Sequence, residues 1–206
     1  MKKWEVLDSK LVFDTKWYKV RKDHVRTESG KVFDDYYLGA QPDYISLVAL
    51  FDNGDALVDR QYRHGAGEVS LETIGGVIEP GEDPISCGKR ELLEETGYAC
   101  EDIELLSVIN ENPTKSISKT YILLATGLKK VGEPKTEYNE SEMELLRMPL
   151  SEIISRIQSG EVFSEPAIAS VFLVSLKLGL LNAPIQDLTV KKSRLARLPL
   201  LSRLFK

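Results

Sequence analysis

The chain has 206 residues, of which 42% are hydrophobic and 29% charged, the range of a folded globular protein, and this composition excludes wholesale disorder. Its length favours one domain with an extension. The two cysteines, Cys87 and Cys100, are too few for a disulfide framework, so the reducing cytoplasm is the expected location.

The charge of the chain is unevenly distributed. The net charge is −5, but residues 191–206 contain six basic residues and no acidic one. The remainder therefore carries 21 basic and 32 acidic residues, a net charge of −11. An acidic body disfavours a nucleic-acid partner and suits a protein that concentrates divalent cations.

The first seventy residues are rich in the β-branched and aromatic residues that favour strands. Turn sequences containing Gly30 and Gly54 separate these runs and indicate hairpins. The predicted strands comprise residues 10–13, 17–26, 31–38, 44–51, 56–61 and 69–74.

The middle of the chain predicts a loop followed by a helix. Residues 75–81 contain three glycines and a proline, which favours a loop. Asp83 is a suitable N-cap, Pro84 fits the first helical position, and Gly97 is suited to end the helix, which therefore spans 84–96.

Two further strands and two helices are expected after this helix. The strands are predicted at 103–110 and 120–126, and the helices at 151–159 and 166–180. Because residues 166–180 are apolar on most sides, that helix is expected to be deeply buried or to lie at a subunit interface. This order of elements predicts an α+β or layered α/β domain.

Three glutamates on the predicted central helix point to a metal site. Glu91, Glu94 and Glu95 fall within an arc of about 100° because they are spaced three and four residues apart. Like charges this close repel, which makes sense if Mg²⁺ lies over them, since this ion prefers carboxylate oxygens. Glu82 can add a fourth carboxylate, and Arg90 can hold one of them in place. The alternative is a solvated acidic helix face.

The segment 76–98 resembles the Nudix box. Its fixed positions are filled by Gly76, Glu82, Arg90, Glu91, Leu92, Glu94, Glu95 and Gly97, whereas Tyr98 stands where an aliphatic residue is usual. The resemblance implies an α/β/α sandwich around a mixed sheet that hydrolyses a nucleoside diphosphate linked to another group. It also implies that Glu91 and Glu95 bind Mg²⁺, or Mn²⁺ in its place, with Glu94 assisting and the Gly75 carbonyl as a further ligand.

Within this family, the chain resembles the ADP-ribose pyrophosphatase subgroup. Pro113 lies sixteen residues after Gly97, and residues 58–63 look like the arginine-bearing strand of that subgroup. Residues 72–76 are similar to its Glu-any-Pro-Ala-Gly segment, with Ile74 in place of proline and Gly75 in place of alanine. The implied organisation is an antiparallel β extension (1–42) that forms a homodimer, a Nudix domain (43–190) and a basic tail (191–206).

Candidate residues for the base and the substrate contacts follow from this resemblance. Enzymes of the subgroup often carry the general base on a late acidic loop, and residues 137–144 are such a stretch, with Glu140 as first choice and Glu142 as second. Arg60 and Arg63 are candidate phosphate ligands because a guanidinium matches phosphate geometry, although either can be an ordinary surface residue. Glu72 is a candidate contact to the ribose or base, and Trp17 to adenine across the dimer, although core packing is the commoner role of one tryptophan.

Other functions remain open from the sequence alone. The substrate can be another sugar nucleotide or a dinucleotide such as NADH instead of ADP-ribose. A non-catalytic nucleotide-sensing module is the alternative from another class, but such a module is expected to lose box glutamates, and this chain keeps them all. The basic tail alternates with leucines and can contact an anionic membrane, although docking, subunit contact or disorder is favoured.

Overall fold

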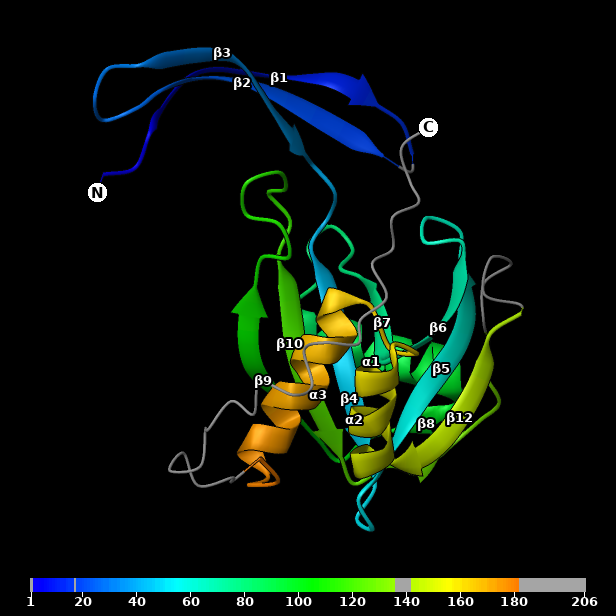
Figure 1. Cartoon of the computed structure of the whole chain (residues 1–206). Helices are drawn as coiled ribbons and strands as arrows, with labels where there is room; N and C mark the ends of the chain where they lie inside the picture. The colour runs from blue at the N-terminus through cyan, green and yellow to red at the C-terminus, as the bar shows by residue number, and fades with distance from the viewer. Residues whose placement is uncertain (1, 17, 136–141, 182–206) are drawn as a thin grey trace, which may run out of the picture.

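A computed structural model describes residues 2–16, 18–135 and 142–181 and confirms the expected sandwich around a mixed sheet (Figure 1). Within the described residues, seven strands form the central sheet: β4 (Tyr44–Leu50), β5 (Asp55–Arg63), β6 (Glu68–Glu72), β7 (Ile74–Val77), β9 (Asp102–Ile109), β10 (Thr120–Thr126) and β12 (Glu144–Pro149). The β4–β10 pair is parallel, whereas the other pairs are antiparallel.

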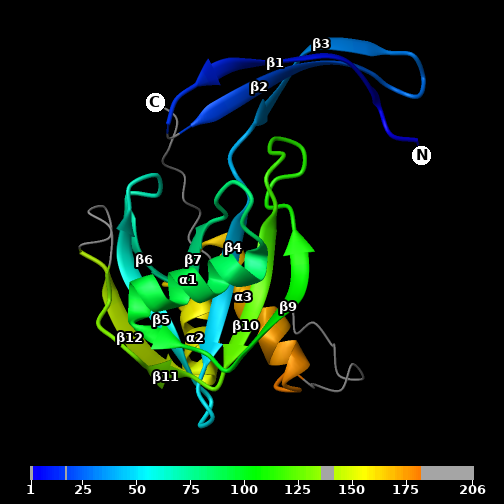
Figure 2. The ribbon, with the colours of Figure 1, turned by 180° about the vertical axis from the view of Figure 1, so that it is seen from behind.

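Helices cover both faces of this sheet. Helix α1 (Pro84–Thr96) lies on one face, and α2 (Leu150–Ser159) and α3 (Glu165–Lys177) lie on the other, as Figures 1 and 2 show from opposite sides. Each face has its own hydrophobic core because strand side chains alternate. Ile45 and Leu47 belong to the core under α1, and Val48 to the core under α2 and α3.

Strand β4 pairs with different strands at its two ends, and the sheet opens where the partner strand changes. Its Ala49 and Leu50 pair with β5, whereas residues 44–47 pair with β7. Strand β6 stays with β5, so the chain crosses from one partner to the other at Thr73. The sheet therefore divides next to the N-terminal end of β4.

The residues that were expected to begin and end α1 do so in the structure. The Asp83 carboxylate accepts hydrogen bonds from the backbone N–H groups of Ile85 and Ser86 at 3.0 and 3.1 Å, which caps the helix. Gly97 ends the helix with a φ of 69°, a left-handed conformation that favours glycine. The predicted helix 84–96 is confirmed.

Three expectations need correction. Residues 75–81 are not entirely a loop, because residues 74–77 form β7. The predicted strand 69–74 is two strands broken at Thr73, and the last helix ends at Lys177, not at 180. A glycine pair normally weakens a strand, but here residues 75 and 76 are approached so closely by neighbouring side chains that only glycine fits, as shown below.

The N-terminal extension is a separate antiparallel sheet of β1 (Glu5–Asp14), β2 (Lys19–Arg26) and β3 (Val32–Gly39). It arches beyond one end of the body in Figure 1. The backbone of Gly39 donates to the Lys115 carbonyl at 2.6 Å, and the Tyr36 hydroxyl donates to the Thr114 carbonyl at 3.1 Å.

Two short strands, β8 (Tyr98–Ala99) and β11 (Lys129–Lys130), pair beyond the end of α1. None of the helices in the described part of the chain is both long and apolar enough to cross a lipid bilayer.

Candidate active site

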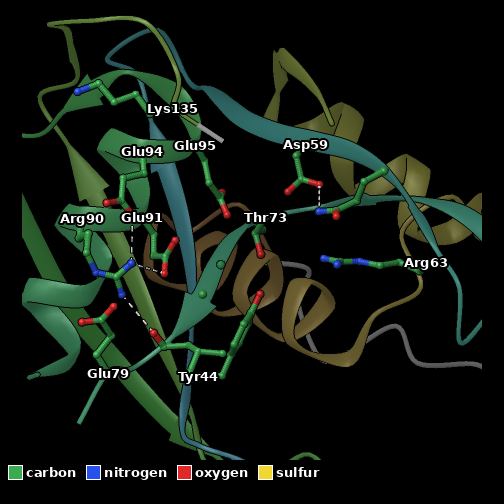
Figure 3. A pocket seen from close by; sticks show the side chains of 14 residues that line it. Tyr44, Asp59, Arg63, Thr73, Glu79, Arg90, Glu91, Glu94, Glu95 and Lys135 are labelled. Atoms are coloured by element: carbon green, nitrogen blue, oxygen red, sulfur yellow. Dashed lines mark hydrogen bonds and ion pairs between the residues drawn. The ribbon is translucent and has the colours of Figure 1, made fainter. Parts of the chain in front are cut away.

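A polar cavity of about 530 Å³ lies between α1 and β5, where the sheet divides (Figure 3). Helix α1 supplies one wall with its carboxylates, and alternate residues of β5 supply the opposite wall. The residues that line the cavity are Tyr44, Asp59, Gln61, Arg63, Thr73, Gly75, Gly76, Val77, Glu79, Arg90, Glu91, Glu94, Glu95 and Lys135.

Arg90 ties the helix to the preceding loop and strand. Its guanidinium donates to both carboxylate oxygens of Glu82 at 2.9 and 3.0 Å, to Glu91 at 2.7 Å and to Glu94 at 3.1 Å. It also donates to the Val77 carbonyl at 3.2 Å. These hydrogen bonds lower the pKa of Glu82 to about 2. Glu82, Arg90 and Glu91 thus form one charged cluster that sets the helix against β7.

Gly76 lies directly under Glu91. A Cβ atom at position 76 would overlap the Glu91 carboxylate and lie 2.6 Å from its Cγ. No residue other than glycine leaves room for this carboxylate, which explains why β7 has no side chain here. The Glu91 side chain is mostly buried, and Glu95 is only 5% exposed. Glu91 is therefore held against the backbone of β7, and Glu95 is buried one turn further along the same helix.

The chemistry of these donors fits a hard divalent cation. Glu91, Glu94 and Glu95 line one cavity together with Gly75, and oxygen ligands of this kind suit Mg²⁺. Within residues 2–16, 18–135 and 142–181, no three acidic, histidine or cysteine side chains are already grouped as metal ligands. Arg90 engages both Glu91 and Glu94. Arg90 contacts one oxygen of each carboxylate, Oε1 of Glu91 and Oε2 of Glu94, so it can orient both side chains beside a bound cation.

The wall formed by β5 is also polar. Arg63 donates to both oxygens of Glu72 at 3.0 and 2.6 Å, a bidentate pair. Gln61 donates to the carboxylate of Asp59 at 2.6 Å, and Asp59 is only 2% exposed. Burial and the surrounding carboxylates, Glu95 first among them, raise the pKa of the Tyr44 hydroxyl far above its usual value. Five carboxylates and three cationic side chains are among the residues that line this cavity.

A second cavity, of about 780 Å³, adjoins the first. The two share Tyr44, Arg63, Thr73 and Val77, which form the wall between them. The second cavity is less polar, with Phe163 among its lining residues. Two adjoining compartments of different polarity suit a ligand with two chemically different halves.

Not every predicted site residue lies at these cavities. Arg63, Gly75, Gly76, Arg90, Glu91, Glu94 and Glu95 line the first cavity, and Glu72 lines the second. Arg60 lines neither, because strand alternation turns it to the other face of β5, where it donates to Glu144 at 2.9 Å. Pro113 and Glu142 are exposed and line neither of them. Trp17, Glu140 and residues 191–206 lie outside the described residues.

Several lining residues were not predicted from the sequence. Asp59 and Gln61 share a face of β5 with Arg63, so the two-residue period of a strand is a signal that could have found them. Tyr44 and Lys135 lie far from the Nudix box in sequence. The backbone of Lys135 donates to the Glu94 carbonyl at 2.6 Å, a tertiary contact with no signal in the sequence.

The chain is similar to several known proteins. An ADP-ribose pyrophosphatase of Mycobacterium tuberculosis is 30% identical over 175 residues, which cover 83% of each chain. A methanol dehydrogenase activator of Bacillus methanolicus is 23% identical over 173 residues, covering 84% of this chain and 93% of that protein. The fold matches a crystal structure of an ADP compounds hydrolase with a TM-score of 0.74 and 20% identity, covering 87% of this chain and 96% of that one.

Family models match two consecutive parts of the chain. Residues 4–38 match the nucleoside diphosphate sugar hydrolase N-terminal domain, and residues 41–170 match the NUDIX domain. The second match spans more than half of the chain and contains the carboxylate helix with both walls of the polar cavity. The chain belongs to the Nudix hydrolase family.

Proposed function

We propose that the protein hydrolyses the pyrophosphate bond of ADP-ribose, or of a related nucleoside diphosphate sugar, with Mg²⁺ as cofactor. The products are a nucleoside monophosphate and a sugar phosphate. The observation that carries this proposal is the presence of Glu91, Glu95 and Gly75 around one cavity that β5 closes with polar groups. The similarity to the ADP-ribose pyrophosphatase of Mycobacterium tuberculosis supports the choice of substrate.

In this proposal, Glu91 and Glu95 hold the metal, with Glu94 assisting and the Gly75 carbonyl as a further ligand. Bound Mg²⁺ neutralises phosphate oxygens and lowers the pKa of the attacking water. Arg90 keeps Glu91 over Gly76, because its guanidinium is fixed in turn by Glu82. A carboxylate of residues 137–144, Glu140 first and Glu142 second, takes the proton from the attacking water.

Arg63 and Glu72 are the proposed substrate contacts among the residues at the cavities. Their bidentate pair orients the guanidinium along the wall that both cavities share. A fixed guanidinium loses little entropy when it meets a phosphate oxygen. Arg60 is not included, since it pairs with Glu144 away from both cavities.

The metal-dependent reaction is tested by incubating the full chain with ADP-ribose, with Mg²⁺ or with EDTA, and separating the products by chromatography. AMP and ribose 5-phosphate are expected with Mg²⁺, and no products with EDTA. A panel that includes ADP-glucose, UDP-glucose and NADH ranks the substrates. Preference for NADH would contradict the nucleotide-sugar assignment, and nucleotide binding without turnover of any of them would favour a sensor.

A homodimer formed by the N-terminal sheet belongs to the same proposal, because Trp17 is proposed to reach adenine in the partner's site. Large apolar side chains of β1 and β3, including Val6, Phe13 and Val32, are exposed in the single chain. Exposed apolar side chains gathered on one small sheet favour a protein interface there.

A further inference from the structure

Tyr44 begins β4 at the point where the sheet divides, and its side chain leans over Gly75. A Cβ atom at position 75 would overlap the Tyr44 hydroxyl and lie 2.9 Å from Cζ of the ring and 3.0 Å from the Ile45 carbonyl oxygen. Alanine is usual at this position in the segment that residues 72–76 resemble. The ring of Tyr44 accounts for the glycine found here instead.

The phenol of Tyr44 stands between the two cavities. It lines both of them, as do Arg63, Thr73 and Val77. In Figure 3 the hydroxyl end of the ring points toward Thr73, in the space between the α1 carboxylates and Arg63. A ligand that occupies both cavities must therefore pass this hydroxyl.

Several other polar side chains around the cavities have partners in the structure, although the Arg63 guanidinium keeps donors that its pair with Glu72 does not use. Arg63 is paired with Glu72, and Arg90 with Glu82, Glu91 and Glu94. The Thr73 hydroxyl shares a hydrogen bond with Ser46 at 2.7 Å. Among the residues that the structure describes, no group hydrogen-bonds with the Tyr44 hydroxyl. A phenol is protonated at neutral pH and can donate.

We propose that Tyr44 donates a hydrogen bond to a phosphate oxygen of the substrate and is a substrate-binding residue of the site. This inference rests on the proposed function, since it takes a diphosphate to lie across the α1 carboxylates. The hydroxyl lies against Gly75, whose carbonyl is a proposed metal ligand, so a cation held there would bring the diphosphate close to this hydroxyl. The ring then separates the two halves of the substrate, one in each cavity.

The test removes only the hydroxyl. Tyr44→Phe is expected to raise the KM for ADP-ribose about tenfold, the effect of losing one hydrogen bond to a charged group, while kcat stays within about twofold. Calorimetric binding of the non-hydrolysable α,β-methylene analogue of ADP-ribose should weaken by the same factor. Tyr121→Phe is the matched control, because the Tyr121 hydroxyl contacts Asp43 at 3.5 Å and lines neither cavity.

A second pair of variants tests the contact with Gly75. Gly75→Ala displaces the Tyr44 hydroxyl and should weaken binding of the analogue as Tyr44→Phe does. In the Tyr44→Ala background the added methyl group meets no phenol, so Gly75→Ala should weaken binding little further. Additive losses would show that alanine acts through the backbone of β7 instead, and would overturn this part of the inference.

Unchanged binding of the analogue in Tyr44→Phe overturns the inference, as does a loss confined to kcat. These outcomes are separate from a failure of the proposed function. If the wild-type chain binds the analogue but hydrolyses no ADP-ribose, the proposed reaction fails, and the calorimetric comparison still decides whether Tyr44 contacts the diphosphate. A wild-type chain that neither binds nor hydrolyses these compounds overturns both.

Discussion

Glu91, on α1, contacts both the backbone of β7 and the charged cluster around Arg90. It lies over Gly76 and accepts from Arg90, so its position depends on both neighbours. Glu91→Gln keeps the shape and removes the charge. We expect Mg²⁺ affinity, measured by calorimetry, to fall at least tenfold, and turnover of ADP-ribose to fall by about two orders of magnitude.

Glu104→Gln is the matched control for this variant, since Glu104, on β9, pairs with Lys177 at the end of α3, away from the cavity. It should bind Mg²⁺ like the wild type. Equal Mg²⁺ affinities of Glu91→Gln and the wild type would exclude Glu91 as a ligand.

The general base gives a second prediction for a single residue. Glu140→Gln should lower turnover by about two orders of magnitude or more and leave Mg²⁺ affinity nearly unchanged, because a base acts on the proton and not on the metal. Steady-state kinetics with calorimetry separate the two effects. Turnover near the wild-type value would transfer the role to Glu142 or to the helix.

Among single residues, the sequence predicts those site residues whose positions follow from their spacing along a helix. Glu91, Glu94 and Glu95 line one cavity because a helical turn brings them together. Arg60 and Arg63 were equivalent candidates, yet they lie on opposite faces of β5. Tyr44 could not be predicted, since its role depends on the glycine beneath it and on a break in the sheet thirty residues along the chain.

At the scale of elements, the contacts of Arg90 join the loop before α1, the helix itself and β7. The pKa of Glu82 is lowered from 4.5 to about 2 by hydrogen bonds from Arg90. The folded protein therefore keeps this carboxylate ionised at pH values where the unfolded chain binds a proton. The resulting stabilisation is complete above about pH 4.5 and is lost as the pH falls toward 2.

Urea unfolding between pH 3 and pH 6 tests this linkage. The free energy of unfolding should fall less steeply with decreasing pH in Glu82→Gln than in the wild type. Glu68→Gln, at an exposed position on β6, should keep the wild-type slope. Parallel curves for Glu82→Gln and the wild type would show that the Arg90 contacts do not contribute to stability in this pH range.

Helix α1 and strand β7 differ in how well the sequence predicts them, and the reason is physical. Helix α1 was predicted to the residue because Asp83, Pro84 and Gly97 act on the backbone within one turn. Strand β7 was missed because its glycines are dictated by side chains from elsewhere, Tyr44 and Glu91, which occupy the space above them. Strand identity here follows from tertiary packing and not from intrinsic preference.

For the whole molecule, the main question is what covers the N-terminal sheet. Of β1, only Leu7 is partly buried, and Leu11 and Phe13 are about half exposed. Contacts with the body run mainly through the end of β3 and the loop before β10. A three-stranded sheet needs an apolar face covered to be stable. A second copy of the chain can supply that cover.

We therefore expect the full chain to sediment as a dimer in analytical ultracentrifugation, and the double variant Leu11→Asp/Phe13→Asp to sediment as a monomer. Charges buried at an interface without partners oppose association. Val131→Asp places the same charge at an exposed apolar position of the body and should stay dimeric. If Trp17 reaches the partner's site, the monomeric variant also has a raised KM for ADP-ribose, whereas a monomeric wild type of full activity would exclude the dimer as part of the site.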